Sequence, residues 1–486
     1  MDTKKLRQKI LDLAIHGKLV PQDPNDEPAS VLLERIRAEK ERLVKEGKIK
    51  KSKASKTSDT PHYENVPFEV PNGWVWSILP NLCTIPITDG THQTPTYTDK
   101  EHGIPFISSK DVTSQKINWD NIKYITKELH EELYKRVAPQ KDDILLAKNG
   151  TTGVAAIVED SRVFDIYVTL ALIRPNKNVN PYYLYYVINS GFCKEQFNSH
   201  LTGIGLPNLH LTDIKKTFIP LPPLTEQERI VSEIKRWFTL IDKLEQEKTD
   251  LLTAIKQTKS KILDLAIHGK LVPQDLNDEP ASELLKRINP NAEITCDNGH
   301  YQNLPKGWCT TSIKNICDNI NGLWKGKKDP FINVGVIRNA NFTKDFKLDY
   351  SNIEYIDVEQ RAFSQRHLKN GDLIIEKSGG SDNYPVGRAI LYEGKDELYS
   401  FSNFTMVLRI KDKNIISSKF LYYFLLDKYK KGVMRTMQTQ TTGLHNLILD
   451  KYLSMELCIP PYSEQKRIID AIEELFDKLD AIMESL

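Results

Sequence analysis

The stretch KILDLAIHGKLVPQDPNDEPAS, residues 9–30, occurs a second time as KILDLAIHGKLVPQDLNDEPAS, residues 261–282. The two copies differ at one position only, which is Pro24 in the first copy and Leu276 in the second. Such near identity within one chain does not arise by chance. It indicates that one supersecondary unit is built twice.

A second, more diverged repeat has a different spacing. PPLTEQERIVSEIKRWFTLIDKLE begins at Pro222 and PPYSEQKRIIDAIEELFDKLDAIM begins at Pro460, an offset of 238 residues, whereas the first repeat has an offset of 252. The central segment 225–268 therefore matches the C-terminal tail over its first half and the N-terminal segment over its second half. Joining residue 486 to residue 1 would rebuild a second copy of this segment. We interpret the chain as a circularly permuted tandem repeat whose two ends lie side by side.

The central segment also carries an apolar heptad pattern. Counting sevens from Ile234 and from Trp237 gives ten positions, of which eight are apolar. About 44 residues at 1.5 Å each would make a rod of roughly 66 Å. Thr225 is the expected N-cap, with Glu228 three residues on, and Gly269 is expected to end the helix.

Because an apolar seam has to be buried, we predict an antiparallel coiled coil with pseudo-twofold symmetry between the central helix and the end segments. The alternative is two amphipathic helices that each pack on their own domain. The predicted seam residues are Leu6, Ile10, Leu13, Ile234, Trp237, Ile241, Leu244, Leu251, Ile255, Ile262, Leu265, Ile472, Leu475, Leu479 and Ile482.

Two segments of similar length, residues 57–221 and 296–458, share short motifs. Both open on Pro-x-Gly-Trp, contain Asp, an apolar strand and Lys-x-Gly, and close on Gly-Leu-x-Asn-Leu. We predict the α+β class, with two similar α/β domains separated by long helices. The other expected segments are 1–56 (helix and basic linker), 222–295 (long helix and repeat) and 459–486 (C-terminal helix).

Composition and motifs exclude several classes of protein. Residues are 40% hydrophobic and 27% charged, and no run of about 18 apolar residues occurs, so neither wholesale disorder nor a membrane span is indicated. The start MDTKKLRQKI does not resemble a signal peptide, so we expect a cytoplasmic protein. The six cysteines form no CxxC pair, which argues against a zinc knuckle.

Catalytic motifs are also missing from the sequence. NPYY at 180–183 resembles an amino-methyltransferase tetrapeptide, but it follows a predicted strand without a glycine-rich loop and is interpreted as a helix start. Asp372 with Glu376 and Lys377 lacks nuclease spacing, and no GxxxxGK[ST] motif occurs. His16 and His268 are expected to cap helices. We therefore predict no catalytic residue and no metal ligand in this chain.

Two similar but non-identical heads on a rigid spacer suit the recognition of a bipartite, asymmetric DNA sequence across an unread gap. The repeats, the Pro-x-Gly-Trp openings and the Gly-Leu-x-Asn-Leu loops together resemble the specificity subunits of type I restriction-modification enzymes over essentially the whole chain. The resemblance implies that the two heads are target recognition domains and that the helical repeats are conserved spacers.

The resemblance also implies partners. One specificity subunit binds two modification subunits, which are adenine methyltransferases, and restriction-translocation subunits complete the endonuclease. S-adenosylmethionine, ATP and magnesium are expected on those partners, and none of them on this chain. A stand-alone restriction-methylation enzyme and a coiled-coil scaffold without DNA recognition are the alternatives.

The near-neutral total charge of +2 hides a regional difference. Residues 57–221 contain 15 basic and 18 acidic residues, a net charge of −3, whereas residues 296–458 contain 23 and 18, a net charge of +5. The linker 35–56 contains ten basic and three acidic residues and is either a solvated linker or a contact to phosphate or to an acidic partner. We therefore expect weak binding of DNA by the chain alone and a partner that completes the grip.

Base contacts are expected from polar and basic residues in loops of the heads, because their side chains present donors and acceptors to base edges. The candidates in the first head are His92, Gln93, Thr94, Ser108, Ser109, Lys110, Lys148, Asn149, Thr151 and Thr152. The candidates in the second head are Trp324, Lys325, Lys327, Arg338, Asn339, Lys377, Ser378, Ser381, Asn383 and Arg388.

Overall fold

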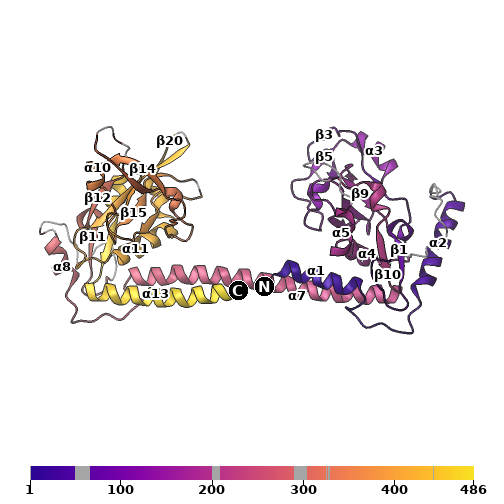
Figure 1. Ribbon diagram of the computed structural model, residues 1–486, viewed down its shortest axis with the longest axis horizontal. Coiled ribbons are helices and arrows are strands. Elements are labelled where there is room, and N and C mark those ends of the chain that lie inside the picture. Colours follow the sequence, from indigo (N-terminus) through magenta and orange to yellow (C-terminus); the bar gives the residue numbers. More distant parts are fainter. Residues whose placement is uncertain are drawn as a thin grey trace. The chain divides into compact units, whose positions relative to one another are not determined.

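The computed structural model describes residues 2–49, 66–199, 208–288, 290, 304–323, 326, 329–381, 383–441 and 443–486. It divides into two compact units, Met1–Glu247 and Lys248–Leu486 (Figure 1). Each unit combines helices with small, mostly antiparallel sheets, which confirms the predicted α+β class. Helix α7 (Leu224–Ile267) contributes its first half to one unit and its second half to the other.

In the first unit, β1 pairs with β10, and two four-stranded sheets have the orders β2-β9-β6-β7 and β3-β5-β4-β8. The strands are β1 (Val75–Ile78), β2 (Thr88–Asp89), β3 (Tyr97–Thr98), β4 (Ile104–Ile107), β5 (Lys123–Ile125), β6 (Ile144–Ala147), β7 (Ala155–Ile157), β8 (Asp165–Ile166), β9 (Leu170–Ile173) and β10 (Phe218–Leu221). The helices besides α7 are α1 (Thr3–Ile15), α2 (Ala29–Lys45), α3 (Lys127–Arg136), α4 (Pro181–Ile188), α5 (Gly191–Asn198) and α6 (Leu211–Ile214).

In the second unit, β11 pairs with β22, and the other sheets have the orders β12-β19-β15-β17, β14-β13-β18 and β16-β21-β20. The strands are β11 (Cys309–Ser312), β12 (Cys317–Asn321), β13 (Phe331–Ile337), β14 (Glu354–Glu359), β15 (Leu373–Glu376), β16 (Ser378–Gly379), β17 (Ala389–Leu391), β18 (Tyr399–Phe401), β19 (Thr405–Ile410), β20 (Gln438–Thr441), β21 (Leu444–Leu447) and β22 (Glu456–Ile459). The helices are α8 (Ala281–Ile288), α9 (Ile313–Ile316), α10 (Gln360–Gln365), α11 (Ser418–Lys430), α12 (Leu449–Leu453) and α13 (Tyr462–Ser485).

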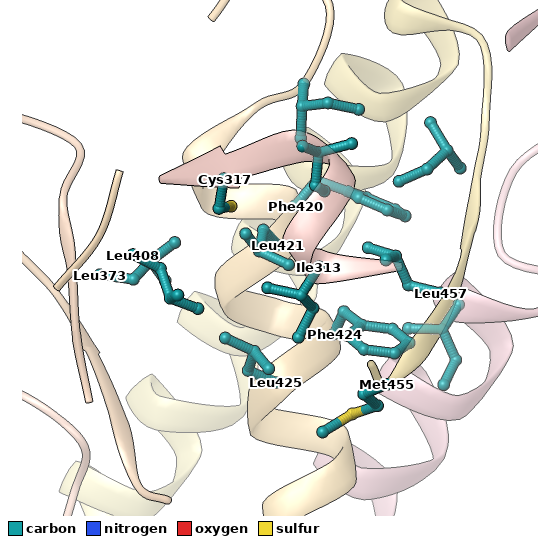
Figure 2. Packing of buried hydrophobic residues seen from close by; sticks show 14 of the residues in the cluster. Ile313, Cys317, Leu373, Leu408, Phe420, Leu421, Phe424, Leu425, Met455 and Leu457 are labelled. Atoms are coloured by element: carbon teal, nitrogen blue, oxygen red, sulfur yellow. The ribbon is translucent and has the colours of Figure 1, made fainter. Parts of the chain in front are cut away.

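The central strands of the sheets β2-β9-β6-β7 and β12-β19-β15-β17 are short and apolar, and both faces are covered. β6 and β9 of the first unit are buried at every position, as is β15 of the second. In the second unit, α11 lies in the middle of the core with Phe420, Leu421, Phe424 and Leu425 (Figure 2). Side chains of β15 and β19 lie on one side of this helix and those of the segment 455–457 on the other. Continuous apolar runs of four to six residues are typical of such buried strands.

The repeated motifs form a hydrogen-bonded hub in the first unit. Trp74 of the Pro-x-Gly-Trp opening donates from Nε1 to Glu226 Oε2 at 2.9 Å, and Gln22 of the repeat donates to Glu226 Oε1 at 3.1 Å. The neighbouring Gln227 accepts from the backbone nitrogen of Asn180 at 2.9 Å. Glu226 is only 1% exposed, so these donors satisfy a carboxylate that has lost its water.

The second unit has the same hub. Trp308 donates to Glu464 Oε2 at 3.0 Å, Gln274 donates to Glu464 Oε1 at 3.4 Å, and Gln465 accepts from Ser417 N at 2.8 Å. Burial raises the pKa of Glu464. The three motifs that recur in the sequence therefore recur because each copy joins the repeat, the domain opening and the start of one helix, α7 in the first unit and α13 in the second, at one point.

Glycine is required in this hub at one position of each repeat. Gly17 and Gly269 have φ values of +64° and +63°. A Cβ atom on Gly17 would lie 2.3 Å from Pro71 Cγ, and one on Gly269 would lie 2.4 Å from Pro305 Cγ. Only glycine combines the left-handed backbone with this close approach.

In the first unit α1 lies along the first half of α7 in the opposite direction (Figure 1). Arg7 contacts Asp242 at 2.7 Å and Glu245 at 3.1 Å, and its guanidinium lies 5.0 Å from the ring centre of Phe238. In the second unit α13 lies along the second half of α7, also antiparallel, because Lys259 contacts Asp480 and Lys248 contacts the last carbonyl, of Leu486. The antiparallel pairing is confirmed within each unit. The same helices also pack on the core of their own unit, as the alternative expected.

The composition of the seam differs from the prediction. Ile10, Ile234, Ile241, Ile255, Ile262 and Ile472 are buried, and Leu6, Leu13, Leu265, Leu475 and Leu479 are half-buried. Trp237, Leu244, Leu251 and Ile482 are exposed by 37–44%, so placing them in a buried seam was wrong. Successive helix residues are about 100° apart around the axis. Counted from the buried Ile234, the buried stripe therefore continues through Phe238, four residues on, and not through Trp237, three residues on.

Local details of the helix ends also bear on the sequence predictions. Helix α7 begins at Leu224, so Thr225 is not the N-cap; its hydroxyl donates to Asp26 instead. Asn180 is the N-cap of α4, with Pro181 as the first helical residue, which confirms NPYY as a helix start. His16 ends α1, and its Nδ1 lies 2.8 Å from Asp12 O, as expected of a capping residue.

Candidate nucleic-acid interface

Most of the candidate DNA-contacting residues follow three equivalent strands in each unit. In the first unit they lie after β2, β4 and β6, and in the second unit after β12, β13 and β15. β2 and β6 both pair antiparallel with β9, so their carboxyl ends share one edge of the sheet; the same holds for β12 and β15 on β19. The fold therefore gathers residues that are far apart in the sequence.

Backbone contacts connect the three loops of the first unit. Lys148 N donates to Thr169 O at 2.8 Å, and Ser109 N donates to Thr169 Oγ1 at 3.0 Å. Thr91 N donates to Ile166 O and Val168 N to Thr91 O. The three residues between β8 and β9, 167–169, are the junction of the loops.

Lys148 is buried in the first unit and its charge is neutralised. Its Nζ lies 2.6 Å from Asp89 Oδ2, and Lys148 and Asp89 are 7% and 5% exposed. His92 Nε2 lies 3.3 Å and Arg136 Nη2 3.5 Å from Asp89 Oδ1. Burial raises the pKa of Asp89, but the hydrogen bonds and charges of Lys148 and His92 together outweigh it, and the pKa lies below its usual value. Lys148 thus holds the loops together and is not directed at solvent.

Lys377 occupies the equivalent position in the second unit, with a different partner. Lys377 N donates to Phe404 O, as Lys148 N does to Thr169 O. Its Nζ lies 3.1 Å from Asn321 Oδ1, and Asn321 stands where the first unit has Asp89. An amide oxygen carries no formal charge, so this contact does not neutralise the half-buried lysine.

The residues after Asp89 and Asn321 support this alignment. A Cβ atom on Gly90 would lie 1.9 Å from Ile166 O, and one on Gly322 would lie 1.9 Å from Ser402 O. Both positions therefore need glycine for the same close approach of two backbones. The two units share the scaffold of this edge and differ in its side chains.

The loops after β4 and β13 have a common shape. Ser108 N and Ser108 Oγ donate to Asp111 Oδ2, and Arg338 N donates to Asn341 Oδ1 at 2.9 Å. Ser108 and Arg338 thus occupy equivalent positions, as do Ser109 and Asn339. Arg338 also forms an ion pair with Glu354, and Asn339 Nδ2 donates to Ser378 O at 2.6 Å, which joins this loop to the one after β15.

The other candidates are placed as follows. His92, Gln93, Thr94, Lys110 and Thr151 are exposed, Asn149 and Thr152 are half-buried, and Ser381 and Asn383 are exposed. Arg388 is bound within the protein, because its Nε donates to Glu376 Oε2 at 3.2 Å and Glu376 is 5% exposed. Trp324, Lys325 and Lys327 lie outside the described residues.

A buried ion pair explains the aspartate of the shared Asp-strand-Lys-x-Gly motif. Asp143 accepts two bonds from Arg174 at 2.7 Å, and Asp372 accepts two from Arg409 at 2.7 and 2.9 Å. Both aspartates are at most 1% exposed. These pairs join the start of β6 to the end of β9 and the start of β15 to the end of β19, so they stabilise the strands that carry the loops from the end opposite the loops.

The basic linker is only partly described. Residues 35–45 belong to α2, where Arg35 pairs with Glu27, and Arg42 pairs with Glu39 and Glu46. Lys40 donates to Pro80 O at 2.8 Å, and burial lowers its pKa. Several of these cations are therefore engaged within the protein. Residues 50–56 lie outside the described part.

One structural element was missed as a candidate. Strands β20 and β21 form a hairpin with the sequence QTQTTGLHNL that pairs through β21 with β16, directly after Lys377. In the sequence, the Gly-Leu-x-Asn-Leu part of this hairpin is interpreted only as a shared closing motif, and not as a reading surface. Alternation of Gln and Thr before a glycine is a hairpin signal that could have found it.

Within the described residues, no group of three or more His, Cys, Asp and Glu side chains is placed to hold a metal ion. None of the helices in this described part is long and apolar enough to cross a membrane. The fold and the polar loops define a two-domain recognition protein in which one scaffold is used twice with different surface chemistry.

Comparison with known proteins agrees with this class. The family described as "Type I restriction modification DNA specificity domain" matches the chain twice, over residues 71–254 and 305–486. The EcoAI specificity subunit of Escherichia coli, a type I restriction enzyme subunit, is 30% identical, with 97% of this chain and 88% of the relative covered. The EcoEI specificity subunit of Escherichia coli is 28% identical, with 99% and 90% covered.

A solved structure shows the same fold. It is described as "Structural basis underlying complex assembly and conformational transition of the type I R-M system", and its matching chain has a TM-score of 0.56 at 18% identity, covering 86% of this chain and 94% of that one. The chain therefore belongs to the family of type I restriction-modification DNA specificity subunits. Its role in such a system is to provide DNA sequence specificity, which is a non-catalytic role.

Proposed function

We propose that this chain reads a bipartite, asymmetric DNA target, with one half-site for each domain, and directs methylation and cleavage that partner subunits perform. The observation that supports the proposal is the set of three equivalent strand-end loops in each unit. Their backbones correspond, whereas their side chains differ: Asp89 against Asn321, Ser108 against Arg338, Ser109 against Asn339. Two equivalent backbones that carry different hydrogen-bond donors and acceptors are suited to recognise two different DNA sequences.

Charge supports unequal roles for the two domains. The first domain has a net charge of −3 and buries Lys148 in an ion pair, whereas the second has a net charge of +5 and keeps Lys377 without a carboxylate at the equivalent position. Neutralised phosphates contribute most of the nonspecific binding energy of a DNA-binding protein. The second domain therefore supplies more of this chain's own affinity, and the partners supply the rest.

The partners we propose are two modification subunits, together with restriction-translocation subunits. A duplicated surface supports two copies of one partner. In the first unit a groove is lined by Lys4, Lys5, Gln8, Lys9, Asp12 and His16 of α1 and its C-cap, together with Phe68 and Phe192. In the second unit a shallow depression on α7 is lined by Lys256, Gln257, Ser260, Lys261 and Asp264, each 252 residues after its counterpart in the first unit.

The exposed apolar residues of α7 support docking of a partner helix. Trp237, Leu240 and Leu244 are 37–44% exposed in the first unit and recur at the spacing of one helix face. Exposed apolar stripes on an otherwise charged helix mark interaction sites.

We propose that S-adenosylmethionine, ATP and magnesium bind to the partners, where the chemistry takes place.

Sequencing that detects N6-methyladenine in DNA is the test. Cells that produce the chain with its methyltransferase partner are expected to show one methylated motif with two specified parts and an unspecified gap, and cells without the chain to show none. A complex that footprints no discrete site would favour a scaffold. Transfer of methyl groups from S-adenosylmethionine by the purified chain alone would instead establish a stand-alone enzyme and contradict the proposal.

A further inference from the structure

The hairpin of β20 and β21 presents a row of polar residues in the second unit. Asn446 of β21 pairs with Ser378 of β16 on one side and with Thr439 of β20 on the other. Residues directly opposite in a sheet point to the same face, so Ser378, Asn446 and Thr439 lie in one line across three strands. With strands about 4.8 Å apart, this line is about 10 Å long.

The two faces of this sheet differ in burial. Leu447 and His445, which alternate with the row along β21, are 8% and 6% exposed and face the body of the unit. Thr439 is exposed and Leu444, next along the outward face, is 48% exposed. Ser378 and Asn446 are half-buried. The row therefore belongs to the face that solvent reaches.

The base of the hairpin is fixed to the core. Leu447 N donates to Lys377 O at 2.8 Å, Ile448 N donates to Met437 O at 2.8 Å, and Gln438 Oε1 accepts from Val386 N at 3.2 Å. Figure 1 shows β20 at the end of the second unit that lies away from α13. The hairpin is thus an anchored element that extends from its unit, and it is not a loose loop.

We propose that this row reads base edges in the major groove of the second domain's half-site. This inference rests on the proposed function and specifies it. The major groove is about 12 Å wide and admits a two-stranded β-ribbon. Asparagine can bind adenine through two hydrogen bonds, serine and threonine hydroxyls can donate or accept, and an apolar side chain such as Leu444 suits a thymine methyl group.

The surroundings favour DNA as the occupant. Lys377 precedes Ser378 in the chain, and among the described residues its ammonium contacts the neutral amide oxygen of Asn321. The loop after β13 reaches the same place through the bond from Asn339 to Ser378 O. A cation beside a hydrogen-bonding face supplies a phosphate contact next to a base-reading surface, and the domain carries a net charge of +5.

The test uses the complex of the full chain with its methyltransferase partner. Methylation rates are measured on duplexes that carry the target motif and on duplexes with one altered base pair in either half-site. Thr439→Val, Ser378→Ala and Asn446→Ala are each expected to reduce discrimination at one or two base pairs of the second half-site by roughly 5- to 150-fold. Discrimination in the first half-site stays unchanged.

Thr436→Val is the matched control, because it removes a hydroxyl from the segment preceding the hairpin, where Thr436 bonds Val433 O outside the sheet. It is expected to leave all discrimination intact. Thr439 is exposed, so Thr439→Val keeps the test valid if Asn446→Ala lowers the melting temperature.

Folded variants that keep wild-type discrimination at every position would overturn the inference while leaving the proposed function intact. So would a uniform loss of rate on all duplexes, since that is the behaviour of a phosphate contact. A wild-type complex without any two-part motif would overturn the proposed function and this inference with it.

Discussion

At the scale of single residues, the two domains differ most clearly at one pair of positions. Asp89 neutralises Lys148 in the first domain, and Asn321 leaves the charge of Lys377 in place in the second. One atom change, from a carboxylate oxygen to an amide nitrogen, thus separates a lysine that an ion pair neutralises from one whose partner at that position carries no charge. The difference can be tested in both directions.

Asn321→Asp would give the second domain the ion pair of the first. The added carboxylate neutralises Lys377, so the affinity of the complex for DNA is expected to fall and the salt dependence of log K to become shallower by about one unit. Titrations at several salt concentrations measure both. Asn319→Asp, on the same strand and exposed, adds the same charge away from Lys377 and is the control. Equal effects of the two substitutions would show that only net charge matters.

Asp89→Asn would leave Lys148 buried without its carboxylate. Removing one partner of a buried ion pair typically costs 3 to 5 kcal/mol, so unfolding of the first unit should become easier by about that amount. Chemical denaturation measures this loss, and Asp120→Asn, at an exposed position, is the control.

The pH dependence follows from the lowered pKa of Asp89. A carboxyl whose pKa is lower in the folded state stabilises the protein above its unfolded pKa, and this stabilisation is lost as the pH falls through the folded value. In acid, the wild type should therefore approach the stability of Asp89→Asn. A gap between them that stays constant from neutral to acidic pH would contradict this role of Asp89.

At the scale of elements, the long helix buries one stripe and exposes its neighbour. Ile234 and Ile241 are buried in the first unit, and Ile255 and Ile262 in the second, whereas Trp237, Leu244 and Leu251 face solvent. The heptad pattern cannot distinguish these stripes, because both are apolar. The exposed one is a surface that a partner can cover.

Ile234→Ala and Trp237→Ala separate the two stripes. Truncation of the buried isoleucine should cost about 2 to 5 kcal/mol of unfolding free energy, because it leaves a cavity. Truncation of the exposed tryptophan should change stability far less but weaken binding of the methyltransferase partner. Denaturation and pull-down of the complex measure the two effects. Equal destabilisation by both substitutions would mean that Trp237 is part of the seam after all.

At the scale of the whole molecule, the first strand of each domain pairs with the last strand of the same domain, β1 with β10 and β11 with β22. Each domain therefore has a hydrophobic core of its own. This independence is what a reader of two separate half-sites needs.

Exchange of residues 57–221 for the equivalent segment of a relative should change one half-site of the methylated motif and leave the other and the gap unchanged. Motif mapping by methylation-sensitive sequencing measures the outcome. Exchange of residues 296–458 is the reciprocal experiment. Alteration of both half-sites by either exchange would contradict one reader per domain.

The sequence by itself determined the repeats, the two-domain α+β organisation, the antiparallel helices and the family. Each of these depends on patterns that many residues share, so local propensity and hydrophobic periodicity suffice to predict them. The helix start at Asn180-Pro181 and the capping role of His16 are similarly local.

Only the tertiary structure decided which polar residues are bound within the protein and which lie together on one face. Lys148 and Arg388 look like DNA ligands in sequence, yet Asp89 and Glu376 bind them within the protein. Asn446 and Thr439 were not candidates in sequence, yet the sheet places them in line with Ser378. The physical reason is that ion pairing and strand register depend on residues distant in the chain, which sequence pattern does not specify.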